Sequence, residues 1–129
     1  MKLSGSGGRE FLHGQTTADF NECGVGSLRY AAFCNPKGRV LADVLAVIID
    51  EQEILLRGRT TVMAALAEHL KPYLDFSRCS LTPTDWCINC HAGSTDEHHA
   101  GLRFAESSLV AVTVPMGPEH TECWTAQYE

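Results

Sequence analysis

The residues best suited to chemistry gather around one tight turn in the first half of the chain. Lys37 and Arg39 lie in and just after the turn Asn35-Pro36-Lys37-Gly38, and Asp43 follows Arg39 by four positions. Lys and Arg side chains bind carboxylates and other small anions. A carboxylate such as that of Asp43 can instead move a proton or stabilise a developing positive charge. The spacing therefore predicts a site for a small anionic ligand near this turn.

Each of these residues also has a purely structural interpretation. Asp43 could be a strand-end carboxylate that pairs with Arg29, Arg39 or Arg57 and has no chemical use. Lys37 and Arg39 could be solvated residues of an exposed turn. The sequence alone leaves both interpretations open.

The distribution of charge excludes some ligands and favours others. Ten Lys and Arg stand against 16 Asp and Glu, which gives a net charge of −6 at pH 7. Residues 85–129 hold seven of the acids and only one cation. Because this distribution provides no broad basic surface, we expect no direct binding of nucleic acid by this chain. Half of the cations fall in the middle of residues 1–84, namely Arg29, Lys37, Arg39, Arg57 and Arg59.

Two strands must hold the turn in place. Residues 27–34 alternate in the period of two that is typical of a strand. The segment 35–38 has Asn, Pro and Gly at its first, second and fourth positions, which favours a type I β-turn. Residues 40–49 are apolar on both faces, which predicts a strand in the interior of a sheet. Asp43 is the only charged residue of that strand.

The remaining segments predict further strands and two helices. A short helix is expected at residues 9–13, and residues 53–58 should pair back on the long strand as a second hairpin. Thr60 and Thr61 are predicted to cap a longer helix, which Pro72 ends or kinks. The apolar stripe of that helix consists of Val62, Met63, Leu66, Leu70 and Leu74. Short strands are expected at residues 79–83, 85–91 and 108–115.

The order of these elements predicts an α+β fold, in which an antiparallel sheet has helices packed on one face. We expect residues 1–84 to form a first α+β subdomain and residues 85–129 to begin a second β-rich segment that is truncated at its end. The longest apolar run, residues 44–49, is far shorter than the roughly 20 residues of a membrane-spanning helix, so no membrane contact is expected. The first residues contain no secretory signal, so a cytoplasmic location is expected.

The cysteines raise the question of a metal or haem site. Without an export signal, the six cysteines are expected to be reduced thiols. Cys87-Ile88-Asn89-Cys90-His91 matches the C-x-x-C-H motif of c-type haem attachment, and with His98 or His99 the same residues could bind zinc. In a strand, however, Cys87 and Cys90 point to opposite faces. This favours two small buried thiols over a metal or haem binder.

Three segments resemble a known family. The segment from Phe11 to Asp19, FLHGQTTAD, resembles the F-L-x-G-Q-x-T-x-D segment near the start of YgfZ-type folate-binding proteins. The strand, turn and strand from Tyr30 to Asp43 resemble the P-x-G-R hairpin of that family, and the helix around residues 70–74 also agrees. The glycine-cleavage T-proteins are relatives of this family. The resemblance therefore implies the N-terminal part of the T-protein folate-binding fold.

The same resemblance implies a ligand and a cellular role. The implied ligand is tetrahydrofolate or another folate derivative, in contact with Tyr30, Lys37, Arg39 and Asp43. The implied role is that of an accessory protein for iron-sulfur cluster assembly or repair, with iron-sulfur proteins as clients and a link to tRNA modification. No catalytic residue is expected for this role.

An enzyme is the alternative that the resemblance leaves open. The T-protein relatives are aminomethyltransferases, and their strand after the turn carries two adjacent acids at the positions of Ala42 and Asp43. Only the second is an acid here, which argues against aminomethyl transfer if both carboxylates must act near the folate amine. The late K-G-C-x-x-G-Q-E segment of the YgfZ type is also absent from these 129 residues.

Overall fold

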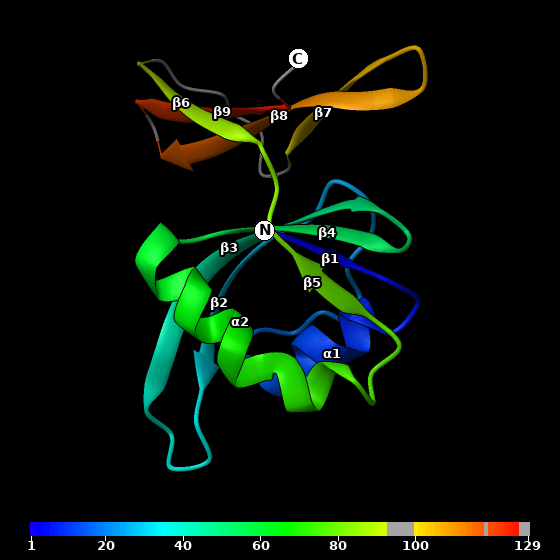
Figure 1. Ribbon diagram of the computed structural model, residues 1–129. Helices are drawn as coiled ribbons and strands as arrows, with labels where there is room; N and C mark the ends of the chain where they lie inside the picture. The colour runs from blue at the N-terminus through cyan, green and yellow to red at the C-terminus, as the bar shows by residue number, and fades with distance from the viewer. Residues whose placement is uncertain (93–99, 118, 127–129) are drawn as a thin grey trace. The chain divides into compact units, whose positions relative to one another are not determined.

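The computed structural model describes residues 1–92, 100–117 and 119–126 of the chain. The chain divides into two compact units, Met1–Pro83 and Thr84–Glu129 (Figure 1). Among the described residues, no helix is long and apolar enough to cross a membrane.

The first unit is built on a five-stranded antiparallel sheet with the strand order β2-β3-β4-β1-β5. The strands are β1 (Lys2–Ser4), β2 (Leu28–Cys34), β3 (Val40–Asp50), β4 (Glu53–Arg57) and β5 (Ser80–Thr82). The strand predicted at residues 40–49 is β3. It pairs with β2 along one edge and with β4 along the other, which confirms its interior place and both predicted hairpins.

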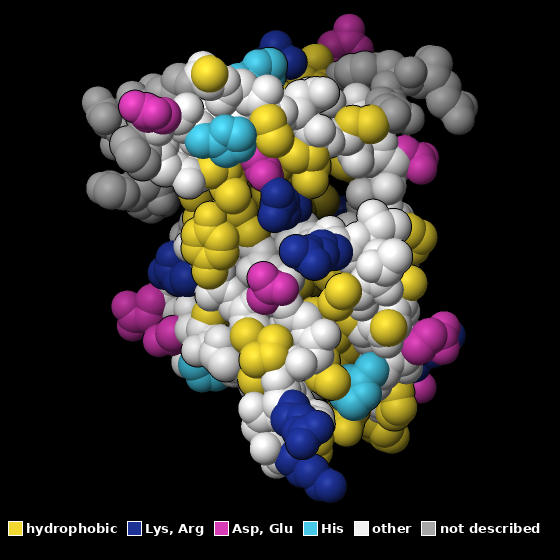
Figure 2. All heavy atoms as spheres, turned by 90° about the vertical axis from the view of Figure 1, so that its left-hand side faces the viewer, with side chains coloured by type: hydrophobic (Ala, Val, Ile, Leu, Met, Phe, Trp, Pro, Cys, Tyr) yellow, Lys and Arg dark blue, Asp and Glu magenta, His cyan; other side chains and the backbone are white. Residues whose placement is uncertain are grey.

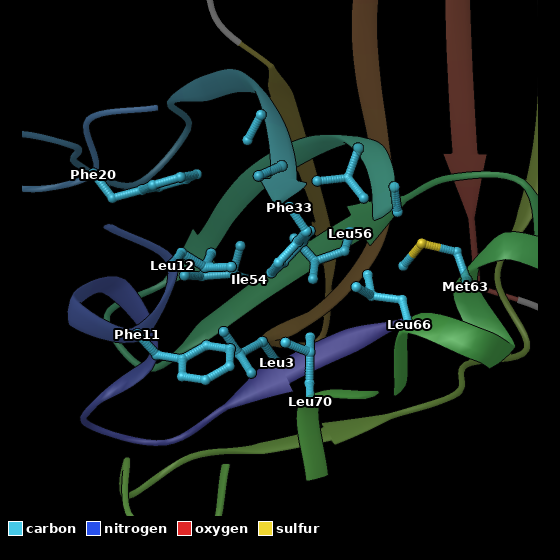
Figure 3. Close-up of a cluster of buried hydrophobic side chains, with 14 of the residues drawn as sticks. Leu3, Phe11, Leu12, Phe20, Phe33, Ile54, Leu56, Met63, Leu66 and Leu70 are labelled. Carbon is cyan, nitrogen blue, oxygen red and sulfur yellow. The ribbon is translucent and has the colours of Figure 1, made fainter. Parts of the chain in front are cut away.

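Helices α1 (Gly8–Gln15) and α2 (Thr60–Leu74) lie on the same face of this sheet (Figure 1). Each helix turns an apolar side toward the strands, as the spacing of its apolar residues requires. Figure 3 shows the resulting cluster of buried side chains, in which Leu12, Phe33 and Leu66 come from α1, β2 and α2 and are at most 2% exposed. The predicted α+β fold with helices on one face of an antiparallel sheet is confirmed.

Helix α2 differs from the prediction in its N-cap and in one of the two effects expected of Pro72, which are an end or a kink of the helix. Its N-cap residue is Arg59, and neither Thr60 nor Thr61 caps it, since no side chain forms a cap hydrogen bond. Pro72 does not end the helix, which continues to Leu74. Proline has no backbone N–H group to donate. Because Pro72 lies in the last turn of α2, the missing hydrogen bond affects only the end of the helix.

The sequence pattern does not reveal β1, because its three residues run directly into the Ser- and Gly-rich residues 4–8. Leu3 at its centre is 1% exposed and lies opposite Ile54 of β4 on one side and Leu81 of β5 on the other. A period of two cannot be recognised over so short a segment. Strand β1 nevertheless joins β5 to the rest of the sheet.

The second unit contains a four-stranded antiparallel sheet with the strand order β6-β9-β8-β7. Its strands are β6 (Cys87–Ala92), β7 (Gly101–Ala105), β8 (Ser108–Gly117) and β9 (His120–Thr125). Strands β6 and β8 correspond to the strands predicted at residues 85–91 and 108–115, whereas β7 occupies a segment for which the sequence predicts no strand. Val112 of β8 and Trp124 of β9 face each other and are both buried.

The turn between β2 and β3 is held by the Asn35 side chain. Its Oδ1 atom accepts hydrogen bonds from the backbone N–H groups of Lys37 and Arg39, both at 3.0 Å. The Gly38 N–H donates to the Asn35 carbonyl at 2.9 Å, and Gly38 has a φ of +78°. Glycine adopts this left-handed backbone without the steric cost of a side chain. The predicted turn at residues 35–38 is confirmed.

Leu66→Ala is expected to lower the free energy of unfolding by about 2 to 5 kcal/mol, because it leaves a cavity in the buried cluster. Urea denaturation followed by circular dichroism measures this change. Phe76→Ala is the matched control, since Phe76 is 90% exposed and its truncation should change the free energy by less than about 0.5 kcal/mol. Equal destabilisation by the two variants would contradict the core described above.

Asn35→Ala is expected to lower the stability of the chain by about 1 kcal/mol, because it removes the acceptor of two backbone donors. Asn35→Asp keeps an oxygen at the same position and should unfold near the temperature of the parent chain. Thermal denaturation of the three proteins gives the comparison. A midpoint for Asn35→Asp as low as that for Asn35→Ala would argue against a structural role for these hydrogen bonds.

Candidate functional site

Three chemically different side chains share one face of the first sheet. Tyr30 of β2 lies opposite Leu45 of β3, and Leu45 lies opposite Arg57 of β4. Asp43 lies two residues before Leu45 and opposite Ala32 of β2. Residues paired across antiparallel strands point to the same face, as do alternate residues along one strand. Tyr30, Asp43 and Arg57 therefore lie on one surface.

This surface is the face of the sheet that points away from the helices. Phe33 and Ala42 form the next cross-strand pair, and both belong to the cluster that packs against the helices. Tyr30 is 67% exposed, and Asp43 is also exposed. Within the ranges that the structure describes, the Asp43 carboxylate forms no hydrogen bond or ion pair. It is therefore available to a ligand.

Lys37 and Arg39 lie at the tip of the β2–β3 hairpin rather than beside Asp43. Both are exposed. Figure 2 shows Lys and Arg side chains at the bottom of the view, at the height where Figure 1 places this tip. An extended strand rises about 3.3 Å per residue, so the Cα atom of Arg39 lies roughly 13 Å along the strand from that of Asp43. Of the four predicted ligand residues, the structure brings Tyr30 and Asp43 together and holds the two cations apart from them.

Arg57 is a residue of this surface that is not among the four predicted ligand residues. In the sequence it is one of five central cations and one of three arginines that could pair with Asp43. Its place follows from register, since it ends β4 opposite Leu45. A methyl group added to the next residue, Gly58, would lie 3.4 Å from the Asp43 carbonyl oxygen, so the end of β4 reaches Asp43.

Arg29 cannot pair with Asp43, so this structural alternative is wrong. Arg29 lies opposite Ala46, which belongs to the buried cluster on the helical side of the sheet. Its guanidinium donates hydrogen bonds to the backbone carbonyls of Asp19 at 3.3 Å and Leu28 at 2.8 Å. Adjacent residues of a strand point to opposite faces, and this alternation separates Arg29 from the surface that carries Tyr30.

The position of Ala42 changes the argument about two adjacent acids. Ala42 is 2% exposed and faces the helices, whereas Asp43 faces the other side of the sheet. A carboxylate at position 42 would be buried among apolar side chains instead of lying beside that of Asp43. The absence of an acid at position 42 is therefore a weaker argument against aminomethyl transfer than adjacency in the sequence suggests.

The C-x-x-C-H segment does not form a single site. Cys87 and Cys90 point to opposite faces of β6, as predicted. The expectation that both thiols are buried is wrong, because β6 is an edge strand on which Cys87 is half-buried and Cys90 is exposed. His91 lies on the face of Cys87, roughly 13 Å further along the strand. His98 and His99, the other predicted zinc ligands, lie outside the described residues.

Burial changes the pKa of one cysteine thiol of the first unit. Desolvation raises the pKa of the Cys79 thiol above its ordinary value. Cys79 is therefore a neutral thiol at physiological pH, and a neutral thiol is a weaker nucleophile and metal ligand than a thiolate. It adds no reactive group to the candidate site.

A separate hollow of about 310 Å³ lies beside α1. Its walls come from α1 and from the segment after α2, and they include Glu10, Phe76 and Arg78. This volume is at the lower limit for small-molecule sites. The residues predicted to bind a ligand are not among the residues that line this hollow.

A solved structure shares the fold of this chain. The crystal structure of glycine cleavage system aminomethyltransferase T from Bartonella henselae matches with a TM-score of 0.79, over 97% of this chain and 38% of that chain. The sequences are 12% identical, so the likeness concerns the fold alone. It confirms the expected N-terminal part of the T-protein fold.

The curated relatives are much longer than this chain. The tRNA-modifying protein YgfZ of Blochmanniella pennsylvanica (strain BPEN) is 26% identical over 106 residues, which cover 81% of this chain and 32% of that protein. An aminomethyltransferase of Mycobacterium avium (strain 104) is 34% identical over 69 residues, which cover 54% of this chain and 19% of that protein. The matched region is therefore about a third or less of each relative.

A protein-family model extends the match across the first unit. The model of the GCVT N-terminal domain matches residues 1–101, which is more than half of the chain. The match includes every strand and helix of the first unit and therefore the surface that carries Asp43. The resemblance to YgfZ-type and T-proteins is confirmed, and the chain belongs to the GCVT N-terminal domain family.

Proposed function

We propose that this chain supplies part of a binding site for tetrahydrofolate or a related folate, on the sheet face that carries Tyr30 and Asp43. The observation that carries the proposal is the exposed Asp43 carboxylate, which has no partner among the described residues and lies on one face with Tyr30 and Arg57. Likeness to an aminomethyltransferase in sequence, and to a T-protein in fold, supports folate as the ligand.

The groups on this surface suit the two ends of a folate. A pterin ring carries N–H donors and a flat face, which match a carboxylate acceptor and an exposed aromatic ring. The glutamate tail of a folate carries carboxylates, which match Lys37 and Arg39 at the hairpin tip. The roughly 13 Å along the strand from Asp43 to Arg39 separates an acceptor from a pair of cations. An extended ligand with a donor head and an anionic tail fits this order.

Binding is the function proposed for this chain, and the activity of a complete protein is a further proposal. One curated relative is named as a tRNA-modifying protein, which supports an accessory role linked to tRNA modification. Iron-sulfur proteins as clients of that role are a proposal that rests on the resemblance to YgfZ-type proteins alone. Two relatives are named aminomethyltransferases, which supports the enzymatic alternative. Folate binding is common to both, so we place it first.

Asp43→Asn is expected to weaken the binding of 5-formyltetrahydrofolate by about 10- to 100-fold, because hydrogen bonds to a charged group contribute about 1.5 to 3 kcal/mol. Isothermal titration calorimetry of the chain, with its cysteines reduced, measures the affinity for 5-formyltetrahydrofolate. Asp50→Asn is the matched control, since Asp50 is an exposed acid at the other end of β3. Failure of the parent chain to bind folate, or an equal loss in both variants, would overturn the proposal.

The double variant Lys37→Gln and Arg39→Gln tests whether these two cations bind the glutamate tail of a folate. It should lower the affinity for a folate triglutamate a few-fold at low salt, because exposed ion pairs contribute about 0.2 to 1 kcal/mol each. The difference should shrink at high salt. Affinity for tetrahydropteroate, which lacks the glutamate, should stay unchanged.

The control for the hairpin variant removes the same charge elsewhere. Lys71→Gln with Arg78→Gln replaces two exposed cations outside the hairpin. An equal loss of triglutamate affinity in this control would assign the effect to net charge rather than to the hairpin tip.

A further inference from the structure

A group of metal-binding side chains lies on the second sheet. The Cys90 Sγ atom, an imidazole nitrogen of His120 and a carboxylate oxygen of Glu122 all lie within 4.8 Å of one another. We propose that these three residues bind a divalent transition-metal ion of the Zn²⁺ class. This proposal is independent of folate binding.

Strand register brings the three side chains together. Cys90 of β6 lies directly opposite Glu122 of β9. His120 lies two residues before Glu122 on the same strand, and alternate residues of a strand share a face. The three ligands therefore come from adjacent strands and point to the same side of the sheet. A bound ion would link edge strand β6 to β9.

The donor set matches the chemistry of zinc. Thiolate, imidazole and carboxylate are the three side-chain ligand types that Zn²⁺ uses in proteins. With bonds of about 2.0 to 2.3 Å, ligands at the corners of a tetrahedron lie roughly 3.3 to 3.7 Å apart. The present separations, which are at most 4.8 Å, would shorten to these values when an ion binds. Three protein ligands leave the fourth position for water or another small ligand.

The environment of Glu122 favours a cation. Glu122 is 2% exposed, and a buried carboxylate requires compensation by hydrogen bonds or positive charge. Its Oε2 atom accepts a hydrogen bond from Trp124 Nε1 at 2.9 Å. Such a bond fixes the orientation of a metal-binding carboxylate. Cys90 and His120 are exposed, so an ion can enter from solvent.

The site differs from the one that the C-x-x-C-H motif predicts. That motif groups Cys87, Cys90 and His91, which the strand alternation divides between two faces. Only Cys90 belongs to the proposed site. Cys87 is therefore a control within the same strand, because it has the same donor atom on the opposite face.

Cobalt(II) is the probe for the first experiment, because its thiolate complexes absorb through sulfur-to-cobalt charge transfer. The reduced, metal-free chain is titrated with CoCl₂ and then with ZnCl₂. The expected result is a charge-transfer band that saturates at about one equivalent of cobalt and is displaced by zinc, because tetrahedral coordination by sulfur and nitrogen ligands suits Zn²⁺, which has no geometric preference from its d-electrons. A parent chain that shows no saturable band would overturn the proposal.

Variants then assign the band to residues. Cys90→Ser should abolish the band and weaken zinc binding by at least about tenfold, whereas Cys87→Ser should retain both. His120→Gln is a second variant, because His120 is exposed and its replacement leaves the core intact. Circular dichroism checks that each variant folds. Retention of the band in folded Cys90→Ser, or its loss in Cys87→Ser alone, would overturn the proposal.

Discussion

Strand β3 is paired along both edges, and its register with β2 and β4 decides which of its side chains face the helices. Because alternate residues point to opposite faces, a slip of one residue would exchange the two sets completely. Ala42 and its alternate neighbours would then face away from the core, and Asp43 would be buried among apolar side chains. The cost of burying an unpaired carboxylate keeps the register where it is. The candidate folate surface depends on this constraint.

The same rule of alternation shapes both candidate sites. On the first sheet it separates Arg29 from its neighbour Tyr30 and brings Tyr30 and Arg57 to the face of Asp43. On the second sheet it separates Cys87 from Cys90 and brings Cys90 and Glu122 to one face. In both cases, neighbours in the sequence are divided and distant residues are joined. Groups that carry chemistry therefore have to be sought across strands rather than along them.

Much of the fold could be predicted because its signals are local. The turn at residues 35–38 follows from three residue types, β3 follows from a run that is apolar on both faces, and α2 follows from its stripe. Strands β1 and β7 could not be predicted, since β1 runs into the Ser- and Gly-rich residues 4–8 and β7 begins at the end of the polar residues 92–101, two compositions that are typical of loops. Their existence depends on pairing with partners elsewhere in the chain.

The candidate sites could be predicted only in part, for a related reason. Tyr30 and Asp43 fall within the segment that resembles the hairpin of YgfZ-type proteins, and that hairpin places them on one face of the sheet. Arg57 and Glu122 reach their sites through register, which is a long-range property of the sheet. A sequence pattern records the type of each side chain and its local period, but it does not record which strand lies opposite.

Strand β1 has a consequence for the order in which the first unit can fold. The meander of β2, β3 and β4 forms from contacts between neighbours in the chain, whereas β1 pairs with β4 about 50 residues away and with β5 about 80 residues away. On a ribosome, β1 would leave the exit tunnel before the other strands of its sheet and would be among the last of them to find its complete set of partners. Until the segment of β5 has emerged, one edge of β1 has no strand to pair with, and the nascent sheet stays open on that side.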